Sequence, residues 1–197
     1  MGCIVISERD VVPKGLSKKV PDEKKILEYV YEDDYRNLDL LEQIMHLEKP
    51  TLFYPGCGAD VIFPLEYAQR LFSPKELRCV FVDKEYVLRQ ILTILDDVGV
   101  SFTKDFRFYW KGMLVKLEFH QADVFKIISA QSFDIYFERA FRIMKGAYHN
   151  YESYVFQQLN NNGFIISDSG FQNVPLQKLN VSQELSSYKE MIIGKKG

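Results

Sequence analysis

The sequence predicts an α/β fold with a doubly wound, mostly parallel sheet, and three observations lead to this prediction. Residues 51–55 form an apolar strand that runs directly into a Gly-x-Gly turn and then into an apolar, helix-like segment over 61–72. A second apolar strand over 77–82 is followed by residues 84–98, in which apolar side chains recur at helical spacing. Both strands are apolar almost throughout, which is typical of strands that are covered on both faces. Two strand–helix units in succession therefore indicate a parallel sheet with helices packed against it.

Length and composition predict one compact domain. The chain has 197 residues, of which 47% are apolar and 14% aromatic, and this is enough to bury a sizeable core. We expect a single domain over 1–197, in which an N-terminal helical extension (1–50) precedes an α/β core (51–197). A helix is predicted to begin at Pro21, where an acidic turn follows, and the helical pattern ends at Lys49-Pro50. Within it, apolar residues recur at helical spacing: Tyr35, Leu38, Leu41, Ile44 and Met45.

Neither the net charge nor the first residues of the chain indicates binding to nucleic acid or to a membrane. The 25 basic and 27 acidic residues leave a net charge of −2, so no overall field draws the chain to nucleic acid or to an anionic membrane. The apolar run at the start is too short for a signal peptide or a membrane span, and Ile6 stands where a myristoylation motif has Ser or Thr. We expect a soluble chain.

The cysteines and histidines predict a reducing compartment and no metal site. The three cysteines form no CxxC pair, which fits the cytoplasm better than a secreted, disulfide-linked domain. The three histidines show no paired spacing of the kind that zinc ligands have. These residues are Cys3, Cys57 and Cys79, and His46, His120 and His149.

The second half of the chain departs once from the alternation of strands and helices. Alternating aromatic and apolar residues on either side of Lys111-Gly112 predict a β-hairpin over 106–119. One face of a hairpin ordinarily packs on the core, so we expect Trp110 and the phenylalanines beside it to be core residues rather than a surface for stacking. The remaining patterns predict a strand over 133–137, a helix over 151–159 with a C-cap at 160–163, a strand over 164–167, and a last strand within 188–196.

The turn after the first strand has the features of a site for a nucleotide-type cofactor. Gly56 and Gly58 let the backbone bend sharply and approach a ligand closely, and the helix that follows offers unpaired amides to an anionic group. Asp83 and Asp123 stand at the ends of the next strands. A carboxylate in such a place accepts hydrogen bonds from two vicinal hydroxyls, and open α/β sheets bind ligands at this edge. A lone Gly-x-Gly is more often a structural turn, but the series of three positions favours a cofactor site.

The same stretches resemble the class I S-adenosylmethionine-dependent methyltransferases. The motifs are Tyr-Pro-Gly-Cys-Gly-Ala-Asp at 54–60, Val-Phe-Val-Asp at 80–83, Gln-Ala-Asp-Val at 121–124 and Phe-Asp-Ile-Tyr-Phe at 133–137, and the resemblance covers residues 50–195. It implies a Rossmann-like methyltransferase fold. It also implies S-adenosylmethionine as cofactor, with S-adenosylhomocysteine as its product, and transfer of the sulfonium methyl group to a nucleophile.

The resemblance implies roles for particular residues. The turn 56–58 matches the loop that wraps the methionine end of the cofactor. Asp83, with Lys84 beside it, matches the acid that binds the ribose hydroxyls. Asp123, followed by Val124, matches the position that faces the adenine amino group.

Two positions depart from the pattern of the family. Tyr54 stands where the family has an acid that helps to organise the loop, and Asp60 stands where it has a third glycine. Asp60 is open to two interpretations: it binds the ammonium group of the cofactor, or it caps the next helix, in whose first turn Pro64 lies. The capping role is favoured.

The candidates for catalysis are Glu138 and Arg139, just past the strand 133–137, and Asp168, just past the strand 164–167. Alignment of nucleophile, methyl carbon and sulfur supplies much of the rate in methyl transfer, so the absence of a catalytic triad is no objection. An exposed salt bridge or a helix start explains these three residues equally well. An aromatic group near the predicted helix 151–159 lines an acceptor pocket or packs half-buried, and packing is favoured: Tyr148, His149, Tyr151 and Tyr154.

The sequence therefore predicts a methyltransferase whose acceptor is unidentified, with a small molecule favoured. Recognition of the acceptor is expected from residues 1–50 and from the loops after the fourth and fifth strands. The alternative is a non-catalytic binding or interaction module of the same fold, which the departures at Tyr54 and Asp60 favour. A nicotinamide-dependent dehydrogenase is disfavoured, because its fingerprint has glycine where this chain has Val61.

Overall fold

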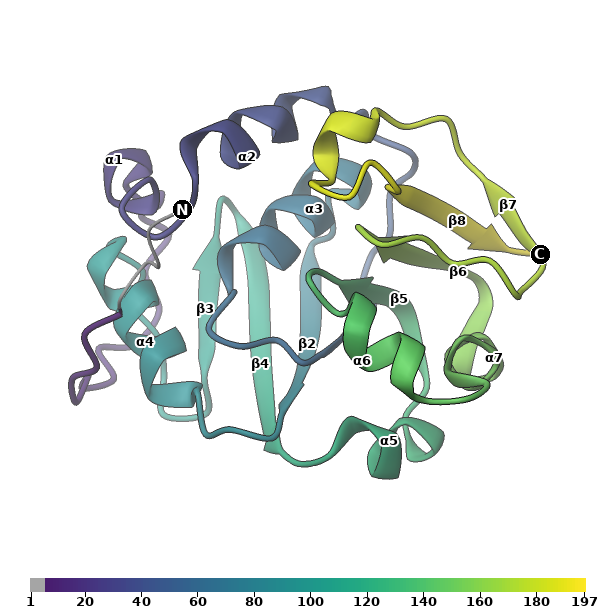
Figure 1. Ribbon diagram of the computed structural model, residues 1–197. Coiled ribbons are helices and arrows are strands. Elements are labelled where there is room, and N and C mark those ends of the chain that lie inside the picture. The colour runs from purple at the N-terminus through teal and green to yellow at the C-terminus, as the bar shows by residue number, and fades with distance from the viewer. Residues whose placement is uncertain (1–5) are drawn as a thin grey trace.

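The computed structural model describes residues 6–197 and contains one eight-stranded mixed sheet (Figure 1). The strand order is β3-β4-β2-β1-β5-β6-β8-β7, and the five central strands β4, β2, β1, β5 and β6 run parallel. β3 at one edge and β8 near the other run antiparallel to their neighbours. The strands are β1 (Thr51–Pro55), β2 (Glu76–Asp83), β3 (Arg107–Trp110), β4 (Met113–Gln121), β5 (Phe133–Glu138), β6 (Leu159–Ser167), β7 (Leu176–Lys178) and β8 (Ile192–Lys196).

Helices cover both faces of the sheet, because alternate residues of each buried strand point to opposite sides. On one face, Leu52 and Tyr54 belong to a core that includes apolar side chains of α3 and α4. On the other face, Phe53 and Val80 belong to a second core with side chains of α5 and α7. This arrangement confirms the predicted doubly wound fold. The helices are α1 (Glu23–Ile26), α2 (Glu32–Asn37), α3 (Ile62–Phe72), α4 (Leu88–Asp97), α5 (Val124–Ile127), α6 (Arg142–Ala147) and α7 (Tyr151–Gln158).

The N-terminal extension is less helical than its periodicity predicts. Its helical part ends with a 3-10 turn at Leu40, and residues 41–50 contain no helix. Their apolar side chains pack on the core while their amides bond to the end of α3: Ile44 N donates to Leu71 O at 2.9 Å and Leu47 N to Phe72 O at 3.1 Å. These bonds satisfy carbonyl groups that every helix leaves open at its C-terminus.

The predicted cap at 160–163 is wrong. α7 passes directly into β6 at Leu159, and the residue with a left-handed backbone is Asn162, at φ 63°. Gly163 serves a different need, because an added Cβ would lie 2.8 Å from the carbonyl oxygens of Asn160 and Asp134, where the pairing of β5 with β6 shifts register.

The hairpin is confirmed, and the starts of one helix and one strand differ from the prediction. Lys111 and Gly112, at φ 45° and 89°, make the two-residue turn between β3 and β4, and Trp110 is fully buried. The helix predicted from Lys84 begins at Leu88, and the last strand begins at Ile192. The short elements α5, α6 and β7 were not predicted. No helix within residues 6–197 has the length and apolar character needed to span a membrane.

Candidate functional site

The site forms where β1, β2, β4 and β5 end, around the turn that follows β1. Gly56 and Gly58 have φ values of 56° and 50°, and Cys57 N donates to Val82 O at 3.2 Å, which ties the turn to β2. The two glycines have different surroundings. A Cβ at Gly56 would lie 2.7 Å from the ring of Phe141, whereas a Cβ at Gly58 would meet no atom within 4 Å. Gly58 therefore faces open space with a backbone that favours glycine.

Asp83 contacts this turn, whereas Asp123 contacts Lys84 and the start of α5. Asp83 Oδ2 accepts a hydrogen bond from Gly58 N at 2.8 Å, and Oδ1 accepts one from Glu85 N at 2.9 Å. Asp123 caps α5 by accepting from Phe125 N at 3.1 Å, and its Oδ2 lies 3.7 Å from Nζ of the exposed Lys84. Both carboxylates are thus fixed by backbone amides, and each carboxylate oxygen of Asp83 retains lone pairs for further donors.

One cavity, of about 250 Å³, lies on the Asp83 side of the turn. Its walls are mostly apolar, with a carboxylate and an ammonium group at the end of β2. Asp123 does not line it, although its neighbour Val124 does. The lining residues are Gly56, Val82, Asp83, Lys84, Ala122, Val124, Ala140, Phe141 and Met144.

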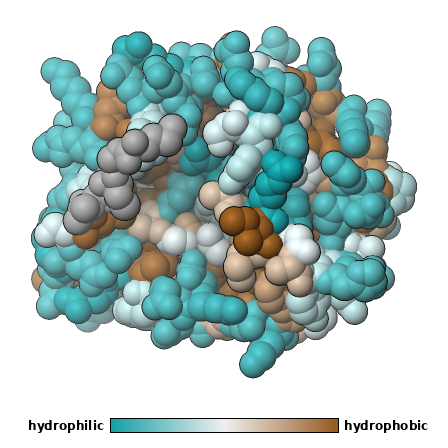
Figure 2. Space-filling model, in the orientation of Figure 1, coloured by the Kyte–Doolittle hydropathy of each residue, from teal (hydrophilic) through white to brown (hydrophobic). Residues whose placement is uncertain are grey.

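A second cavity, of about 450 Å³, lies on the other side of the turn and shares Gly56 and Ala140 with the first. The N-terminal extension and the segment before β8 contribute its rim, and the turn and the end of β5 contribute its floor. Figure 2 shows this face of the molecule hollowed between the N-terminal elements and α6. Its polar and aromatic lining includes Tyr29, Tyr31, Asp34, Tyr54, Cys57, Gly58, Asp60, Phe63, Arg139, Asp168, Ser187 and Tyr188.

Asp60, at the second cavity, combines a capping contact with an ion pair. Its Oδ1 accepts from Phe63 N at 3.2 Å, which is the predicted contact with the first turn of α3. Its Oδ2 accepts from Tyr54 OH at 3.0 Å and lies 3.5 Å from Arg139 Nη1. Tyr54 therefore hydrogen-bonds to the acid six residues later. Burial raises the pKa of Asp60, and the guanidinium of Arg139 acts in the opposite direction.

Arg139 is held on two sides and lines the second cavity. Its Nη2 lies 3.3 Å from Asp34 Oδ2 on α2, and its guanidinium stacks on the ring of Phe63, 3.5 Å from the centroid. The extension thus joins the sheet edge through a charged contact. Arg139 forms ion pairs, as its alternative interpretation expects, but they are only partly exposed, since 24% of its side chain is exposed.

Asp168 also lies at the second cavity, and only 7% of it is exposed. Its Oδ2 accepts from Ala140 N at 2.9 Å, and its buried Oδ1 has no hydrogen-bond donor among residues 6–197. Ala140 has a left-handed backbone at φ 54°, which is strained for a residue with a Cβ. Burial raises the pKa of Asp168 above its ordinary value.

The structure does not bring Glu138 to either of these cavities. The side chain is fully buried, and its oxygens accept from Lys145 Nζ at 2.6 Å, Ser167 Oγ at 2.5 Å and Tyr136 OH at 2.6 Å. The alternative interpretation of an exposed salt bridge is also wrong, since the pair with Lys145 is internal. The sequence gives one signal of this network, the small polar residues Ser167 and Ser169 on either side of Asp168.

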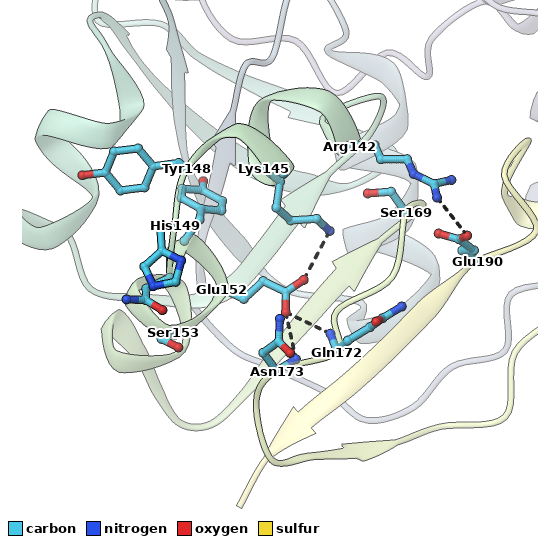
Figure 3. A pocket seen from close by; sticks show the side chains of 13 residues that line it. Arg142, Lys145, Tyr148, His149, Glu152, Ser153, Ser169, Gln172, Asn173 and Glu190 are labelled. Atoms are coloured by element: carbon cyan, nitrogen blue, oxygen red, sulfur yellow. Dashed lines mark hydrogen bonds and ion pairs between the residues drawn. The ribbon is translucent and has the colours of Figure 1, made fainter.

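A third cavity, of about 650 Å³, lies over this network between α6, α7 and the loop after β6 (Figure 3). Glu152 projects into it, 3.9 Å from Lys145 Nζ, and accepts from the backbone amides of Gln172 and Asn173 at 2.9 Å. Of the predicted aromatic group, Tyr148, His149 and Tyr151 line this cavity. Tyr151 is nevertheless packed in the core, as predicted.

Sequence reasoning missed Phe141, Ala140 and the rim residues Tyr31, Asp34 and Tyr188. Phe141 follows Arg139 by two residues, and no pattern marks it as the ring that closes on Gly56. The rim residues belong to segments that carry no motif and meet only in the fold. Within residues 6–197, no three His, Cys, Asp or Glu side chains gather in a way that could hold a metal ion.

Comparison with known proteins finds similarity in structure only. No protein-family model matches the chain, and no curated protein matches it. Among solved structures, a SAM-dependent methyltransferase from Thiobacillus denitrificans in complex with S-adenosyl-L-homocysteine is 12% identical, with 70% of this chain and 48% of that chain covered and a TM-score of 0.45. A methyltransferase from Pyrococcus furiosus is 15% identical over 83% of this chain and 81% of that one, with a TM-score of 0.46. A methyltransferase from Geobacter sulfurreducens is 13% identical over 91% and 80%, with a TM-score of 0.46. The chain spans about half the length of the first of these structures.

Proposed function

We propose that this chain binds S-adenosylmethionine at the edge of the sheet where β1, β2 and β5 end, and that it transfers the methyl group to an acceptor. The observation that carries the proposal is the pair of cavities that share Gly56 and Ala140. Both have largely apolar walls; the first has Asp83 and Lys84 at its edge, and the second has four charged side chains together with several aromatic rings. An elongated ligand with an adenosine end and an amino-acid end suits this division.

The residues present fit such a ligand. Both oxygens of Asp83 keep lone pairs that can accept from two ribose hydroxyls, while the backbone amides of Gly58 and Glu85 hold the carboxylate in place. The space above Gly58 allows close approach to the turn. In the second cavity, Asp60 and Arg139 offer one negative and one positive group to the ammonium and carboxylate of an amino acid.

The part played by the chain is binding and positioning. S-adenosylmethionine supplies, when bound, a methyl group on a positively charged sulfur. Asp83 and the turn fix the adenosine side, so that the reacting groups meet at the junction marked by Gly56 and Ala140. Alignment in a site shielded from water provides about 7–11 kcal/mol of a reaction barrier in favourable cases. We place the acceptor in the second cavity, between the extension and Asp168, and we propose that it is a small molecule.

Calorimetric titration of the full chain with S-adenosylmethionine, S-adenosylhomocysteine and NADH tests the proposal. We expect micromolar binding of the two adenosyl compounds and none of NADH. Asp83→Asn should weaken adenosyl binding about 10- to 100-fold, which corresponds to the loss of a charged hydrogen-bond acceptor. Glu85→Gln is the matched control, because Glu85 is exposed, lines neither cavity and contacts Asp83 through its backbone only. Equal affinities of the two variants would refute the role of Asp83.

A second candidate function, a non-catalytic module of the same fold, is favoured by one contact. The ring of Phe141 closes on Gly56, so the protein itself occupies the space that the missing Cβ leaves. Absence of binding for all three compounds would support this candidate. If the adenosyl compounds bind, release of S-adenosylhomocysteine in the presence of mixed small-molecule acceptors separates an enzyme from a silent module.

We also propose a reducing compartment, the cytoplasm, for this chain. Cys57 and Cys79 are free and buried, and burial raises the pKa of both thiols. Cys3, the third cysteine of the prediction, lies outside the described residues.

A further inference from the structure

The charges around the second cavity do not balance. Asp34, Asp60 and Asp168 contribute three carboxylates to its lining, and Arg139 contributes the only guanidinium or ammonium group among the lining residues described. The rim also carries the rings of Tyr31 and Tyr188, which belong to the extension and to the segment before β8.

Arg139 is paired with two of the carboxylates and not with the third. Its Nη1 lies 3.5 Å from Asp60 and its Nη2 lies 3.3 Å from Asp34. No Lys, Arg or His nitrogen among residues 6–197 comes within 4.0 Å of the Asp168 carboxylate, the limit for an ion pair. Two negative charges therefore remain in excess, and among residues 6–197 the one on Asp168 has no cationic side chain within ion-pair distance.

Asp168 is built into the floor of the cavity with one oxygen unused. The left-handed Ala140 directs its N–H to Oδ2 at 2.9 Å, and the carbonyl of Asp168 accepts from Ser186 Oγ. Oδ1 is buried and has no donor from residues 6–197. A buried acceptor without a donor is costly, and strained backbone beside it is a mark of functional sites.

We propose that the acceptor taken by this cavity is a small amine, bound as its cation by the carboxylate of Asp168. The inference rests on the proposed function, since it names the class of acceptor for the same site. An amine that carries an aromatic or apolar group suits the rim, because that group can pack against the tyrosine side chains. The guanidinium of Arg142 already lies over the ring of Tyr188, 5.4 Å from its centroid.

The same carboxylate has a role in the reaction. A protonated amine has no free lone pair, so its nitrogen must first lose a proton, and Asp168 accepts this proton. The nitrogen then forms a bond to the methyl carbon while the carbon–sulfur bond breaks and sulfur keeps the electron pair. Burial raises the pKa of Asp168, although the amide of Ala140 and the charge of Arg139 lower it, and a raised pKa makes the carboxylate a better base.

Titration of the full chain with phenethylamine and with 2-phenylethanol, its neutral counterpart, tests the inference by calorimetry. We expect the amine to bind more tightly than the alcohol. Asp168→Asn keeps the size of the side chain and an acceptor for Ala140, and it should weaken amine binding about 10- to 100-fold while alcohol binding stays unchanged. Asp105→Asn is the charge-matched control, because Asp105 is exposed and lines neither cavity.

Each outcome decides the inference separately from the proposed function. If the alcohol binds as tightly as the amine to the unaltered chain, or if Asp168→Asn leaves the amine affinity unchanged, the inference is wrong. The preference of the unaltered chain for amine or alcohol tests the inference even if the variant fails to fold. Displacement of the amine by S-adenosylhomocysteine would also overturn it, since the cation site would then belong to the cofactor. Amine binding that depends on Asp168, in a chain that does not bind S-adenosylhomocysteine, would uphold the cation site and refute the methyltransferase.

Discussion

Two strands of the sheet end in an acidic residue, and the two carboxylates have opposite surroundings. Asp83 is the last residue of β2 and Glu138 is the last residue of β5. Asp83 is held by backbone amides, which leave its charge at the edge of a cavity. Glu138 turns into the protein, where Lys145 neutralises it. The position of an acid at a strand end therefore does not by itself assign it to a ligand, because the groups that satisfy it decide its role.

The largest effect is expected where the internal pair is broken. Lys145→Met should lower the free energy of unfolding by about 3–5 kcal/mol, because it leaves the buried carboxylate of Glu138 without its counter-charge. Urea denaturation measures the effect. Lys75→Met is the control, since its pair with Glu48 is exposed and such pairs contribute about 0–1 kcal/mol. Equal destabilisation by the two variants would contradict the distinction between the two acids.

The two glycines of the turn beside Asp83 should separate a packing role from a ligand role. Gly56→Ala should destabilise the chain by about 2–5 kcal/mol, because left-handed backbone costs about 1–2 kcal/mol and the clash with Phe141 adds about 1–3 kcal/mol. Gly58→Ala should cost only the backbone part, about 1–2 kcal/mol, and should weaken adenosyl binding more than its effect on stability explains.

Thermal or urea unfolding of both glycine variants, with and without Phe141→Leu, checks this prediction. In a double-mutant cycle, Phe141→Leu should recover part of the loss at Gly56 and none at Gly58. If Gly58→Ala lowered the unfolding free energy as much as Gly56→Ala, a Cβ at Gly58 would have to clash with other atoms, which would contradict the open space described above it.

The smallest effect is expected at Glu118, a partly exposed acid that serves as a reference for Asp83 and Glu138. The hydrogen bond from Arg78 lowers the pKa of Glu118 from 4.5 to about 2. A pKa that is lower in the folded chain gives stability that is present above about pH 4.5 and is lost as pH falls towards 2. The difference in unfolding free energy between the unaltered chain and Glu118→Gln should be below about 1 kcal/mol at pH 6, because the pair is partly exposed, and smaller at pH 3. A difference that grows as pH falls would contradict the assignment.

The sequence predicts the Asp83 region well and the Glu138 region poorly, for a physical reason. Glycines mark the turn after β1, and a change from apolar to polar residues marks the acid that ends β2 and the acid just after β4. Both signals are local. Glu138 also ends an apolar strand, but its partner Lys145 lies on a short helix that no periodicity marks. The orientation of the Glu138 side chain depends on contacts with β6 and α6, and no single segment of the sequence contains all of these residues.

The N-terminal extension shows the same limit. Residues such as Ile44 have helical spacing in the sequence, yet their amides bond to the end of α3, so tertiary contacts override the local preference. Asp34 has no motif, and it reaches Arg139 only because α2 packs near the edge of the sheet.

The buried thiol of Cys57 gives the turn a built-in chemical reporter. Only 2% of Cys57 is exposed, and a thiol in this state reacts slowly with reagents such as Ellman's reagent until the segment opens. In a chain with Cys3 replaced by serine, the labelling rate at Cys57 measures how often the loop between β1 and α3 separates from β2, because Cys79 lies deeper in the sheet. A compound that binds at the turn should slow the labelling of Cys57, so a screen based on this rate can find ligands before the reaction is known.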